Sequence, residues 1–236
     1  MANKEGIRKL FNNIAADYDR LNHLLSLNID KIWRRKAVRQ IVDVRKPLRV
    51  LDVACGTGDL TIEIARRVAP GSQVTGIDLS EGMMAIGREK IARAGVTAEM
   101  VLGDCEALPY EANQFDRIAV GFGVRNFEHM ERSIREMFRV LVPGGRLLIL
   151  ELSLPTNTFI RRCYKFYFQK ILPIVGGMIS GNYGAYDYLP ASVINFPVPK
   201  RFLEMMEQAG FCELKQKPLT FGICRIYIGT KPLQHD

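Results

Sequence analysis

The segment from Val50 to Thr61 constrains the fold of this chain more than any other. It reads Val-Leu-Asp-Val-Ala-Cys-Gly-Thr-Gly-Asp-Leu-Thr, an apolar strand that runs through a glycine turn directly into a helix. Gly56 and Gly58 let the backbone approach a ligand closely, and the helix that begins near Asp59 offers unpaired amide groups. A dinucleotide-binding loop needs a third glycine where this chain has Thr61. The segment therefore predicts a cradle for a small ligand other than a pyrophosphate.

Carboxylates at the predicted strand ends indicate which ligand this is. Asp52 and Asp59 flank the loop, Asp78 ends a second apolar strand, and Asp104 follows a third. These acids would repel a pyrophosphate, but they suit a ligand that carries an amine and a sulfonium. Asp78 lies about 20 residues past the turn, where an acid can accept hydrogen bonds from both ribose hydroxyls. The pattern favours S-adenosylmethionine, and the alternative is an ordinary tight turn without a ligand.

Length and patterning predict a single α/β domain over residues 1–236. The 236 residues are 47% hydrophobic, which is enough for a full core. Strand-like runs alternate with helical patterns, as in a doubly wound, mostly parallel sheet. We expect strands near 49–54, 73–78, 97–102, 115–121, 146–152, 212–218 and 223–230, and helices near 59–69, 81–94, 131–141 and 199–209.

Two segments lie outside this alternation and are expected to cover the site. Residues 1–45 are helical in pattern and precede the core at 46–153, whereas residues 154–198 interrupt the chain before the closing part at 199–236. Ligands in such sheets bind outside the carboxyl ends of the strands. We therefore predict an N-terminal helical cap and a substrate lid.

Cysteine usage and hydropathy bear on the compartment. The five cysteines are scattered without a C-x-x-C pair, which predicts neither a disulfide framework nor a metal site. The first residues lack a secretory signal, and the apolar segment 171–179 is far shorter than the ~20 residues of a membrane span. A cytoplasmic protein that does not cross the bilayer is expected.

Two further segments resemble the signature sequences of one enzyme family. The first runs from Tyr18 to Ser26 (Tyr-Asp-Arg-Leu-Asn-His-Leu-Leu-Ser) and is followed by Trp33. The second runs from Arg139 to Arg146 (Arg-Val-Leu-Val-Pro-Gly-Gly-Arg) and continues to Glu151-Leu152-Ser153. With the cofactor loop and the stretches 121–126 and 186–189, nearly the whole chain is similar to the ubiquinone/menaquinone biosynthesis C-methyltransferases.

The resemblance implies a class I S-adenosylmethionine-dependent methyltransferase fold, Rossmann-like with a mostly parallel seven-stranded sheet. It also implies methylation of a ring carbon of a polyprenylated demethylquinol. Demethylmenaquinol is the first expected acceptor, and an enzyme that also methylates the benzoquinol precursor of ubiquinone is the alternative. The resemblance places Thr57 and Gly58 near the methionine moiety, Asp78 at the ribose, Asp104 and Cys105 at the adenine, and Gly121 beneath the cofactor. Asp52 and Gly56 of the loop are also expected to bind the cofactor.

The chain departs from the family pattern at two positions. Asp30 stands where the family usually has a histidine, and Asn28 stands where it often has a glycine. A mechanism that uses this imidazole as a base therefore does not carry over directly. Asp30 either takes over as the base or orients the N-terminal helix through a surface ion pair.

The chemistry of quinol methylation indicates the remaining candidates. A ring carbon becomes nucleophilic when a neighbouring hydroxyl loses its proton, so a cation that stabilises the phenolate is required. Arg125, just beyond the fourth strand, is the first candidate, and its alternative role is an ion pair with Glu128. Tyr186 and Tyr188 are expected either to hydrogen-bond the quinol oxygens or to pack beneath the lid. The histidines at 23 and 129 are expected on helix surfaces.

A formal net charge of +8 is typical of a protein with an acidic partner or a well-solvated surface. Around residues 160–171, apolar side chains at Ile160, Tyr164 and Tyr167 alternate with basic residues in helical spacing, which predicts either a helix lying on an anionic membrane or an ordinary lid helix. RNA methylation is the competing function. The chain carries no recognition module for nucleic acid, so a lipid acceptor is favoured.

Overall fold

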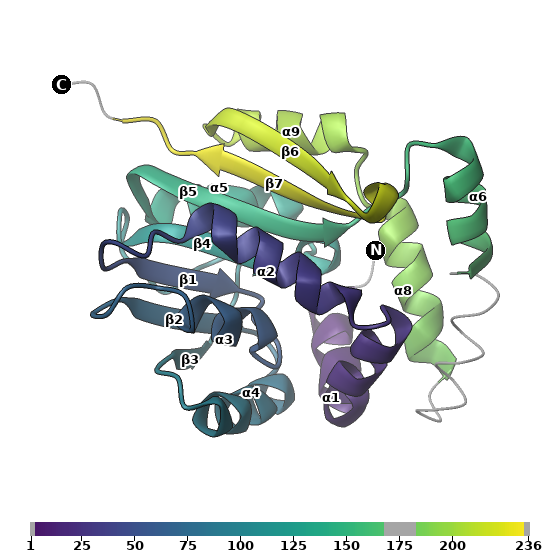
Figure 1. Cartoon of the computed structure of the whole chain (residues 1–236), viewed down its shortest axis with the longest axis horizontal. Coiled ribbons are helices and arrows are strands. Elements are labelled where there is room, and N and C mark those ends of the chain that lie inside the picture. Colours follow the sequence, from purple (N-terminus) through teal and green to yellow (C-terminus); the bar gives the residue numbers. More distant parts are fainter. Residues whose placement is uncertain (1–2, 168–182, 234–236) are drawn as a thin grey trace.

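The computed structural model describes residues 3–167 and 183–233, without the side chains of residues 21, 25 and 183–188 (Figure 1). One seven-stranded sheet has the order β3-β2-β1-β4-β5-β7-β6. Pairing is parallel from β3 to β5, and β7 is antiparallel to both β5 and β6. This confirms the predicted α/β fold with a mostly parallel sheet. The strands are β1 (Arg49–Val53), β2 (Gln73–Asp78), β3 (Glu99–Leu102), β4 (Phe115–Gly121), β5 (Leu141–Leu152), β6 (Cys212–Leu219) and β7 (Cys224–Thr230).

The helices lie on both faces of the sheet and at the carboxyl ends of its strands. They are α1 (Lys4–Leu25), α2 (Ile29–Ile41), α3 (Asp59–Ala65), α4 (Glu81–Ala94), α5 (Met130–Val140), α6 (Thr158–Phe166), α8 (Tyr183–Asn195) and α9 (Pro199–Gln208), with short 3-10 helices η1 (Val124–Asn126) and η3 (Thr220–Gly222). Figure 1 shows α1, α6 and α8 gathered at the end toward which β1 and β4 point. Within the described residues, none of the helices has the length and hydrophobicity that a bilayer span requires.

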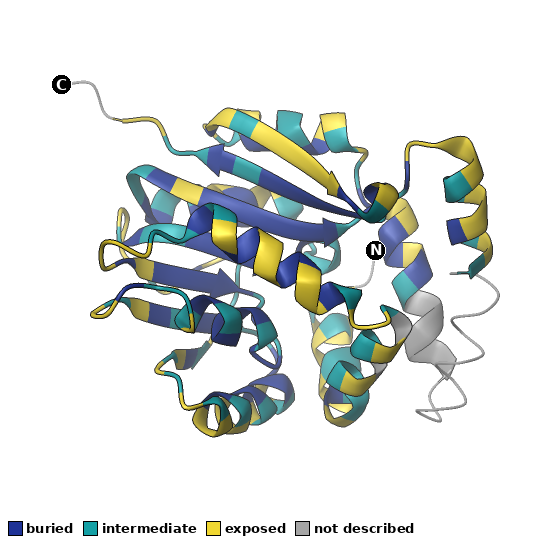
Figure 2. Cartoon of the chain, in the orientation of Figure 1, coloured by how far each residue is buried: buried dark blue, intermediate teal, exposed yellow. Residues whose placement is uncertain are grey.

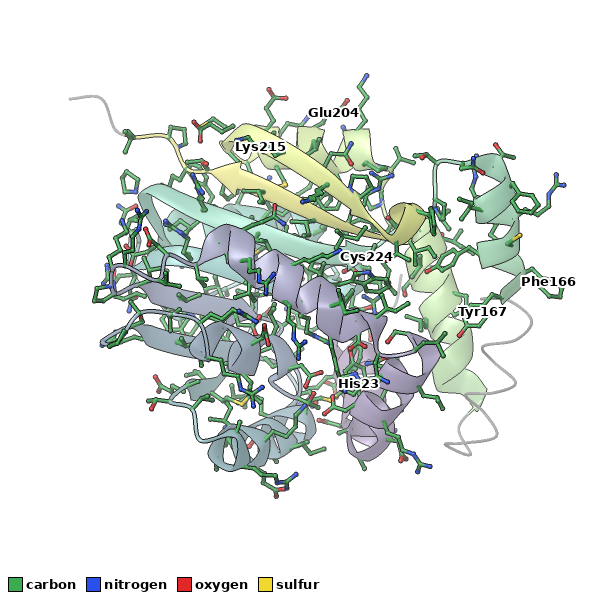
Figure 3. All side chains as sticks on the ribbon, in the orientation of Figure 1. His23, Phe166, Tyr167, Glu204, Lys215 and Cys224 are labelled. Carbon is green, nitrogen blue, oxygen red and sulfur yellow. The ribbon has the colours of Figure 1, made fainter. Side chains whose placement is uncertain are left out.

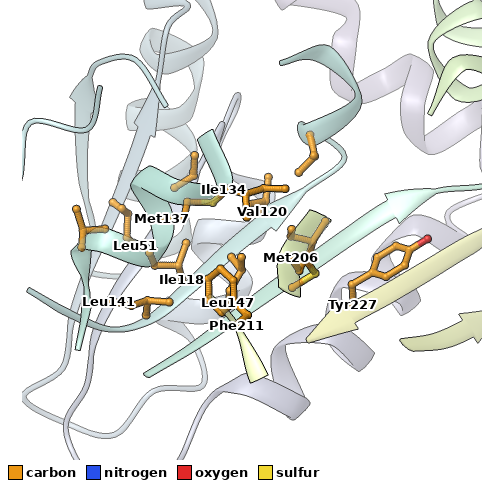
Figure 4. Packing of buried hydrophobic residues seen from close by; sticks show 14 of the residues in the cluster. Leu51, Ile118, Val120, Ile134, Met137, Leu141, Leu147, Met206, Phe211 and Tyr227 are labelled. Atoms are coloured by element: carbon orange, nitrogen blue, oxygen red, sulfur yellow. The ribbon is translucent and has the colours of Figure 1, made fainter. Parts of the chain in front are cut away.

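Alternating side chains along β5 build the two halves of the core. Leu147 and Ile149 point to one face, where they pack with α5 and α9, as Figure 4 shows for Leu147. Leu148 and Leu150 point to the other face, where they pack against Trp33 and its neighbours on α2. This period of two is what a strand buried on both faces requires. Figure 2 shows the central strands almost wholly buried and β6 exposed at the edge.

Several predicted boundaries differ from the structure: the helix expected at 59–69 ends at Ala65, and the strand expected at 97–102 begins at Glu99. β5 begins at Leu141, five residues before the expected start. The strand continues through the expected turn because Lys231, just beyond β7, pairs with it. The Gly144 amide donates to the Lys231 carbonyl at 2.9 Å, and the Lys231 amide donates to the Gly145 carbonyl at 2.9 Å. Of the predicted N-terminal cap, only α1 lies at the strand ends, whereas α2 packs on the face of the sheet through Trp33, Ala37 and Ile41.

Candidate active site

A cavity lies at the carboxyl ends of β1, β2, β3 and β4, and α1 covers it from outside. Five of the residues predicted to bind a cofactor line this cavity: Gly56, Asp78, Asp104, Cys105 and Gly121. The covering helix contributes Lys4, Ile7, Phe11 and Tyr18. We call this the cofactor cavity.

Asp78 is held rigidly at the end of β2. One carboxylate oxygen accepts a hydrogen bond from the Gly56 amide at 2.8 Å, and the other accepts from the Ser80 amide at 2.8 Å. Burial raises the pKa of Asp78, although these amides favour the ionised form. Each oxygen keeps a second lone pair for a further donor. The carboxylate is thus preorganised to accept a pair of hydroxyls, as the ribose of S-adenosylmethionine requires.

The cradle itself depends on glycine. Gly56 has a φ of +55°, and a Cβ placed on it would meet no atom within 4 Å, so this backbone borders open space. Gly58 has a φ of +79° and precedes the first residue of α3. The backbone therefore leaves room for a ligand at the start of α3, which fits the predicted cofactor.

Three predicted cofactor residues, Asp52, Thr57 and Gly58, lie behind the cavity and do not line it. Asp52 is fully buried and accepts a hydrogen bond from Thr61 at 2.6 Å, while its other oxygen has no partner. Burial raises the pKa of Asp52 from 3.8 to about 7. These residues support the loop that carries Gly56.

A polar network connects α1 to the cradle. Thr57 donates a hydrogen bond to Asp19 of α1 at 2.5 Å. Lys90 of α4 pairs with the same aspartate and lies 2.6 Å from Asp59 at the start of α3. The covering helix is therefore fastened directly to the loop beneath it.

Asp30 is buried at the start of α2, with 4% of its surface exposed. It accepts hydrogen bonds from Ser26 at 2.6 Å and from Arg34, and His23 Nδ1 lies 2.8 Å away. Burial raises the pKa of Asp30, but the Ser26 hydrogen bond and the Arg34 charge outweigh burial and hold the pKa below its usual range. The expected surface pair is thus a buried one, and His23 is a partner in it.

A second cavity of about 450 Å³ lies beside the first. Its lining is mostly apolar and aromatic and comes from the α1–α2 turn, α2, α6, α8 and η3: among others Leu27, Ile29, Trp33, Phe122, Leu152, Ile160, Tyr164, Tyr167, Leu189 and Ile223. Tyr18 and Phe122 line both cavities. We call this the acceptor cavity. Of the described residues that line this cavity, only Arg125 and Asp30 were predicted from the sequence to act on the acceptor.

Arg125 lies in η1 and lines the acceptor cavity. Its guanidinium donates to Glu151 at 2.6 Å and to the Phe122 carbonyl at 2.5 Å. Glu151 is fully buried on β5, so the ion pair is shielded from water. Glu128, the partner considered from the sequence, accepts instead from the Lys4 amide at 2.9 Å.

The other sequence candidates are less central. Tyr186 and Tyr188 lie in α8, but their side chains are outside the described part of the structure. His129 is 61% exposed, and its Nδ1 lies 3.0 Å from Glu106. This position fits the surface role expected for it. All five cysteines are free.

Comparison with known proteins places these cavities in a family context. The model of the ubiE/COQ5 methyltransferase family matches residues 1–231. A "Ubiquinone/menaquinone biosynthesis C-methyltransferase UbiE" of Geobacter sulfurreducens is 44% identical over 98% of this chain and 90% of its own length. A "Demethylmenaquinone methyltransferase" of Thermus thermophilus is 44% identical over 94% of this chain and 100% of its own.

Solved structures share the fold at low identity. The [4+2]-cyclase SpnF superposes with a TM-score of 0.70 at 18% identity, over 97% of this chain and 96% of its own. A S-adenosylmethionine-dependent methyltransferase of Thermotoga maritima, described as a possible histamine N-methyltransferase, gives a TM-score of 0.66 at 20% identity, over 95% and 99% of the two chains. These similarities support the architecture, whereas the family match extends to almost the entire sequence.

Proposed function

Because the chain belongs to the ubiE/COQ5 methyltransferase family, it is a methyltransferase with S-adenosylmethionine as its methyl donor, and we propose that its acceptor is a polyprenylated demethylquinol. Demethylmenaquinol is the first candidate, since its oxidised form, demethylmenaquinone, appears in the names of several relatives at 40–44% identity. Methylation of the benzoquinol precursor of ubiquinone by the same site is the second candidate, supported by the name of the Geobacter relative.

The observation that carries the proposal is the meeting of two unlike cavities. The cofactor cavity combines the carboxylates of Asp78 and Asp104 with apolar side chains, whereas the acceptor cavity is lined mainly by aliphatic and aromatic side chains, with Arg125 among its few charged residues. They share Tyr18 and Phe122. A flat, apolar ring in the second cavity would thus lie next to a cofactor in the first, which is the proximity that a direct transfer needs.

S-adenosylmethionine supplies an electrophilic methyl group, and this chain prepares the ring carbon that receives it. We assign Arg125 to stabilising the phenolate that forms when a quinol hydroxyl gives its proton to water. A guanidinium is too weak an acid to be deprotonated, so Arg125 is not the base itself. After transfer, the ring carbon loses its hydrogen as a proton, aromaticity returns, and the phenolate oxygen takes up a proton. The balance is methylquinol, S-adenosylhomocysteine and one proton.

Neighbouring residues position this arginine and the ring. Glu151 fixes the guanidinium through the 2.6 Å ion pair. Removal from water raises the pKa of Tyr18, so its hydroxyl stays protonated and can donate a hydrogen bond to a quinol oxygen. We assign Asp30 to holding Arg34, which lies 5.3 Å from the ring centre of Phe122, rather than to the base role. A hydrogen bond from Tyr186 to the quinol remains part of the proposal.

The acceptor also suggests where the protein works. A polyprenyl tail is soluble in the bilayer, so we propose a cytoplasmic protein that meets the anionic inner face of the cell membrane as a peripheral partner. The net charge of +8 supports attraction to such a surface.

The experiment that tests the acceptor uses purified protein and methyl-labelled S-adenosylmethionine. Demethylmenaquinol with a short prenyl tail, a matched demethylated benzoquinol and total RNA are supplied in separate reactions, and the products are identified by mass spectrometry. We expect label in menaquinol and none in RNA. Label in RNA alone would overturn the proposal, and equal rates on both quinols would establish the dual-specificity alternative.

A further inference from the structure

Three large hydrophobic side chains are held in solvent around the acceptor cavity. Leu27, Phe159 and Phe221 are 76%, 76% and 77% exposed, more than any other large hydrophobic side chain in the described part of the chain. Leu27 itself lines the cavity, Phe159 adjoins the lining residue Ile160, and Phe221 adjoins the lining residue Thr220. We call these side chains the three tips. Their common position at one cavity distinguishes them from singly scattered surface hydrophobics.

The backbone holds two of the tips outward. Leu27 has a φ of 52° and Phe221 a φ of 57°, in the left-handed region that bulky residues rarely adopt. Local hydrogen bonds fix both turns: the Asn28 amide donates to the His23 carbonyl at 2.7 Å, and the Trp33 indole donates to the Thr220 hydroxyl at 2.8 Å. Because these two turns hold Leu27 and Phe221 in unfavourable backbone conformations, the exposed position of both side chains indicates a function.

Helix α6 presents two different faces. The apolar residues expected to face either a membrane or the core, Ile160, Tyr164 and Tyr167, line the acceptor cavity and so face inward. The opposite face carries Phe159 and Phe166, which are 76% and 61% exposed. Figure 3 shows Phe166 pointing away from the fold. The helix is therefore a lid on one side and offers an unpartnered aromatic face on the other.

The segments that carry the tips have an excess of basic residues. Residues 154–167 and 216–225 contain no acidic residue, and residues 22–36 contain only the buried Asp30. The same segments carry the exposed cations Lys31, Arg35 and Arg162. Apolar side chains on segments with this excess of cations complement an anionic lipid surface.

We propose that the three tips insert into an anionic bilayer and place the mouth of the acceptor cavity on the membrane surface. The inference rests on the proposed function in one respect, since a polyprenyl tail would then pass from the cavity into the lipid without crossing water. Docking itself needs no quinol. It can therefore be tested on vesicles without substrate.

The test is flotation of the purified full chain with vesicles of 30% phosphatidylglycerol and 70% phosphatidylcholine. We expect the variant Leu27→Ser/Phe159→Ser/Phe221→Ser to partition at least tenfold more weakly than the unmodified protein, because it loses three apolar side chains from the lipid. The matched control is Val44→Ser/Val198→Ser/Leu233→Ser, whose residues are 67%, 68% and 66% exposed and line neither cavity. The control variant should float like the unmodified protein.

A second set of variants tests the charge. Lys31→Gln/Arg35→Gln/Arg162→Gln should weaken partition by about a hundredfold, since each basic residue near an anionic surface contributes about fivefold. The exposed basic residues of α9 and the far part of β6 provide the control, Lys200→Gln/Arg201→Gln/Lys215→Gln. Figure 3 shows Lys215 far from α6. The control variant should partition into the vesicles almost as strongly as the unmodified protein.

The possible results separate docking from catalysis. Equal flotation of tip and control variants would overturn the proposal, and so would an unmodified protein that forms a dimer through the tips and ignores vesicles. If the triple variant fails to fold, the single changes Phe159→Ser and Phe221→Ser carry the same test. The double variant Phe159→Ser/Phe221→Ser should methylate a short-tailed quinol in solution normally but a long-tailed quinol in vesicles slowly. A protein that floats but methylates neither quinol would contradict the proposed function alone.

Discussion

The cofactor cavity and the acceptor cavity are neighbours built in opposite ways. The first is formed by four consecutive strand ends of one sheet, and its key carboxylate is fixed by backbone amides. The second is assembled from the α1–α2 turn, η1, α6, α8 and η3, which are far apart in sequence. The strand ends of the sheet can bind a cofactor that many enzymes share, whereas the helices and turns outside the sheet form the cavity that selects the acceptor.

The two cavities also treat their buried carboxylates differently. Burial raises the pKa of Asp52 and Asp78 at the cofactor, whereas Asp30 beside the acceptor keeps a lowered pKa through its partners. On the cofactor side the partners of Asp78 do not outweigh burial, so a cationic ligand would stabilise its ionised form. The acceptor side has its acid already neutralised, which suits an uncharged ring.

The largest expected effect concerns Asp52 and the pH dependence of stability. The unfolded chain releases the Asp52 proton near pH 3.8, whereas the folded protein keeps it until about pH 7. The folded state therefore binds more protons in this window, and its free energy of unfolding falls as pH rises, by on the order of 4 kcal/mol from this group.

Urea unfolding at pH 5 and pH 8 measures the part of this effect above pH 5, about 3 kcal/mol. Asp52→Asn should lose much less stability between the two pH values than the unmodified protein. Asp116 accepts a hydrogen bond from the Arg49 amide at 2.7 Å at the amino end of β4, far from the cofactor cavity, and provides the control Asp116→Asn. Identical pH profiles for Asp52→Asn and the unmodified protein would show that Asp52 is ionised in the fold.

The next effect separates the roles of Arg125. Arg125→Met should lower the single-turnover methylation rate by about a hundredfold or more and leave cofactor affinity nearly intact. It should also destabilise the fold by about 3 to 5 kcal/mol, because Glu151 is left buried without its cation. Arg125→Lys should recover only part of the rate, since lysine lacks the planar fork.

The double variant Arg125→Met/Glu151→Gln distinguishes chemistry from stability. We expect this double variant to regain stability but not methylation rate. The control Arg117→Met changes a half-buried arginine near the start of β4 and should keep the full rate. Recovery of the rate in the double variant would remove Arg125 from the chemistry, and Asp30→Asn would become the next variant to test.

A smaller effect is expected at Asp78. Asp78→Asn should weaken S-adenosylmethionine binding by about 1.5 to 3 kcal/mol, the range for a hydrogen bond to a charged group. Calorimetry should show that quinol affinity is unchanged. A folded variant with undiminished cofactor affinity would contradict the assignment of Asp78 to the ribose.

The sequence predicted most of the sheet because its signals are local. Alternating apolar residues marked the strands, and the spacing of Asp78 and Asp104 from the glycine turn marked the cofactor side. The early start of β5 was missed because pairing of Gly144 with Lys231 overrides the local turn signal of proline and glycine. Short-range pattern carries no information about such distant partners.

The acceptor side was predicted less completely for the same reason. Arg125 was found, but its partner Glu151 lies 26 residues away on another strand, and the nearer Glu128 was the acid considered. Helical spacing on α6 showed two faces but not which one would be buried. Only the packing of α6 against the acceptor cavity determines that Phe159 and Phe166 face outward.

The most direct test of the account is calorimetric titration of Ile160→Trp with short-tailed demethylmenaquinol and, separately, with S-adenosylhomocysteine. Ile160 lines the acceptor cavity but not the cofactor cavity. A larger side chain at this position should therefore weaken quinol binding by about tenfold and leave the cofactor affinity unchanged. Ile32→Trp, at a 48% exposed position outside both cavities, should change neither affinity. Undiminished quinol binding by a folded Ile160→Trp variant would contradict the claim that this cavity receives the acceptor.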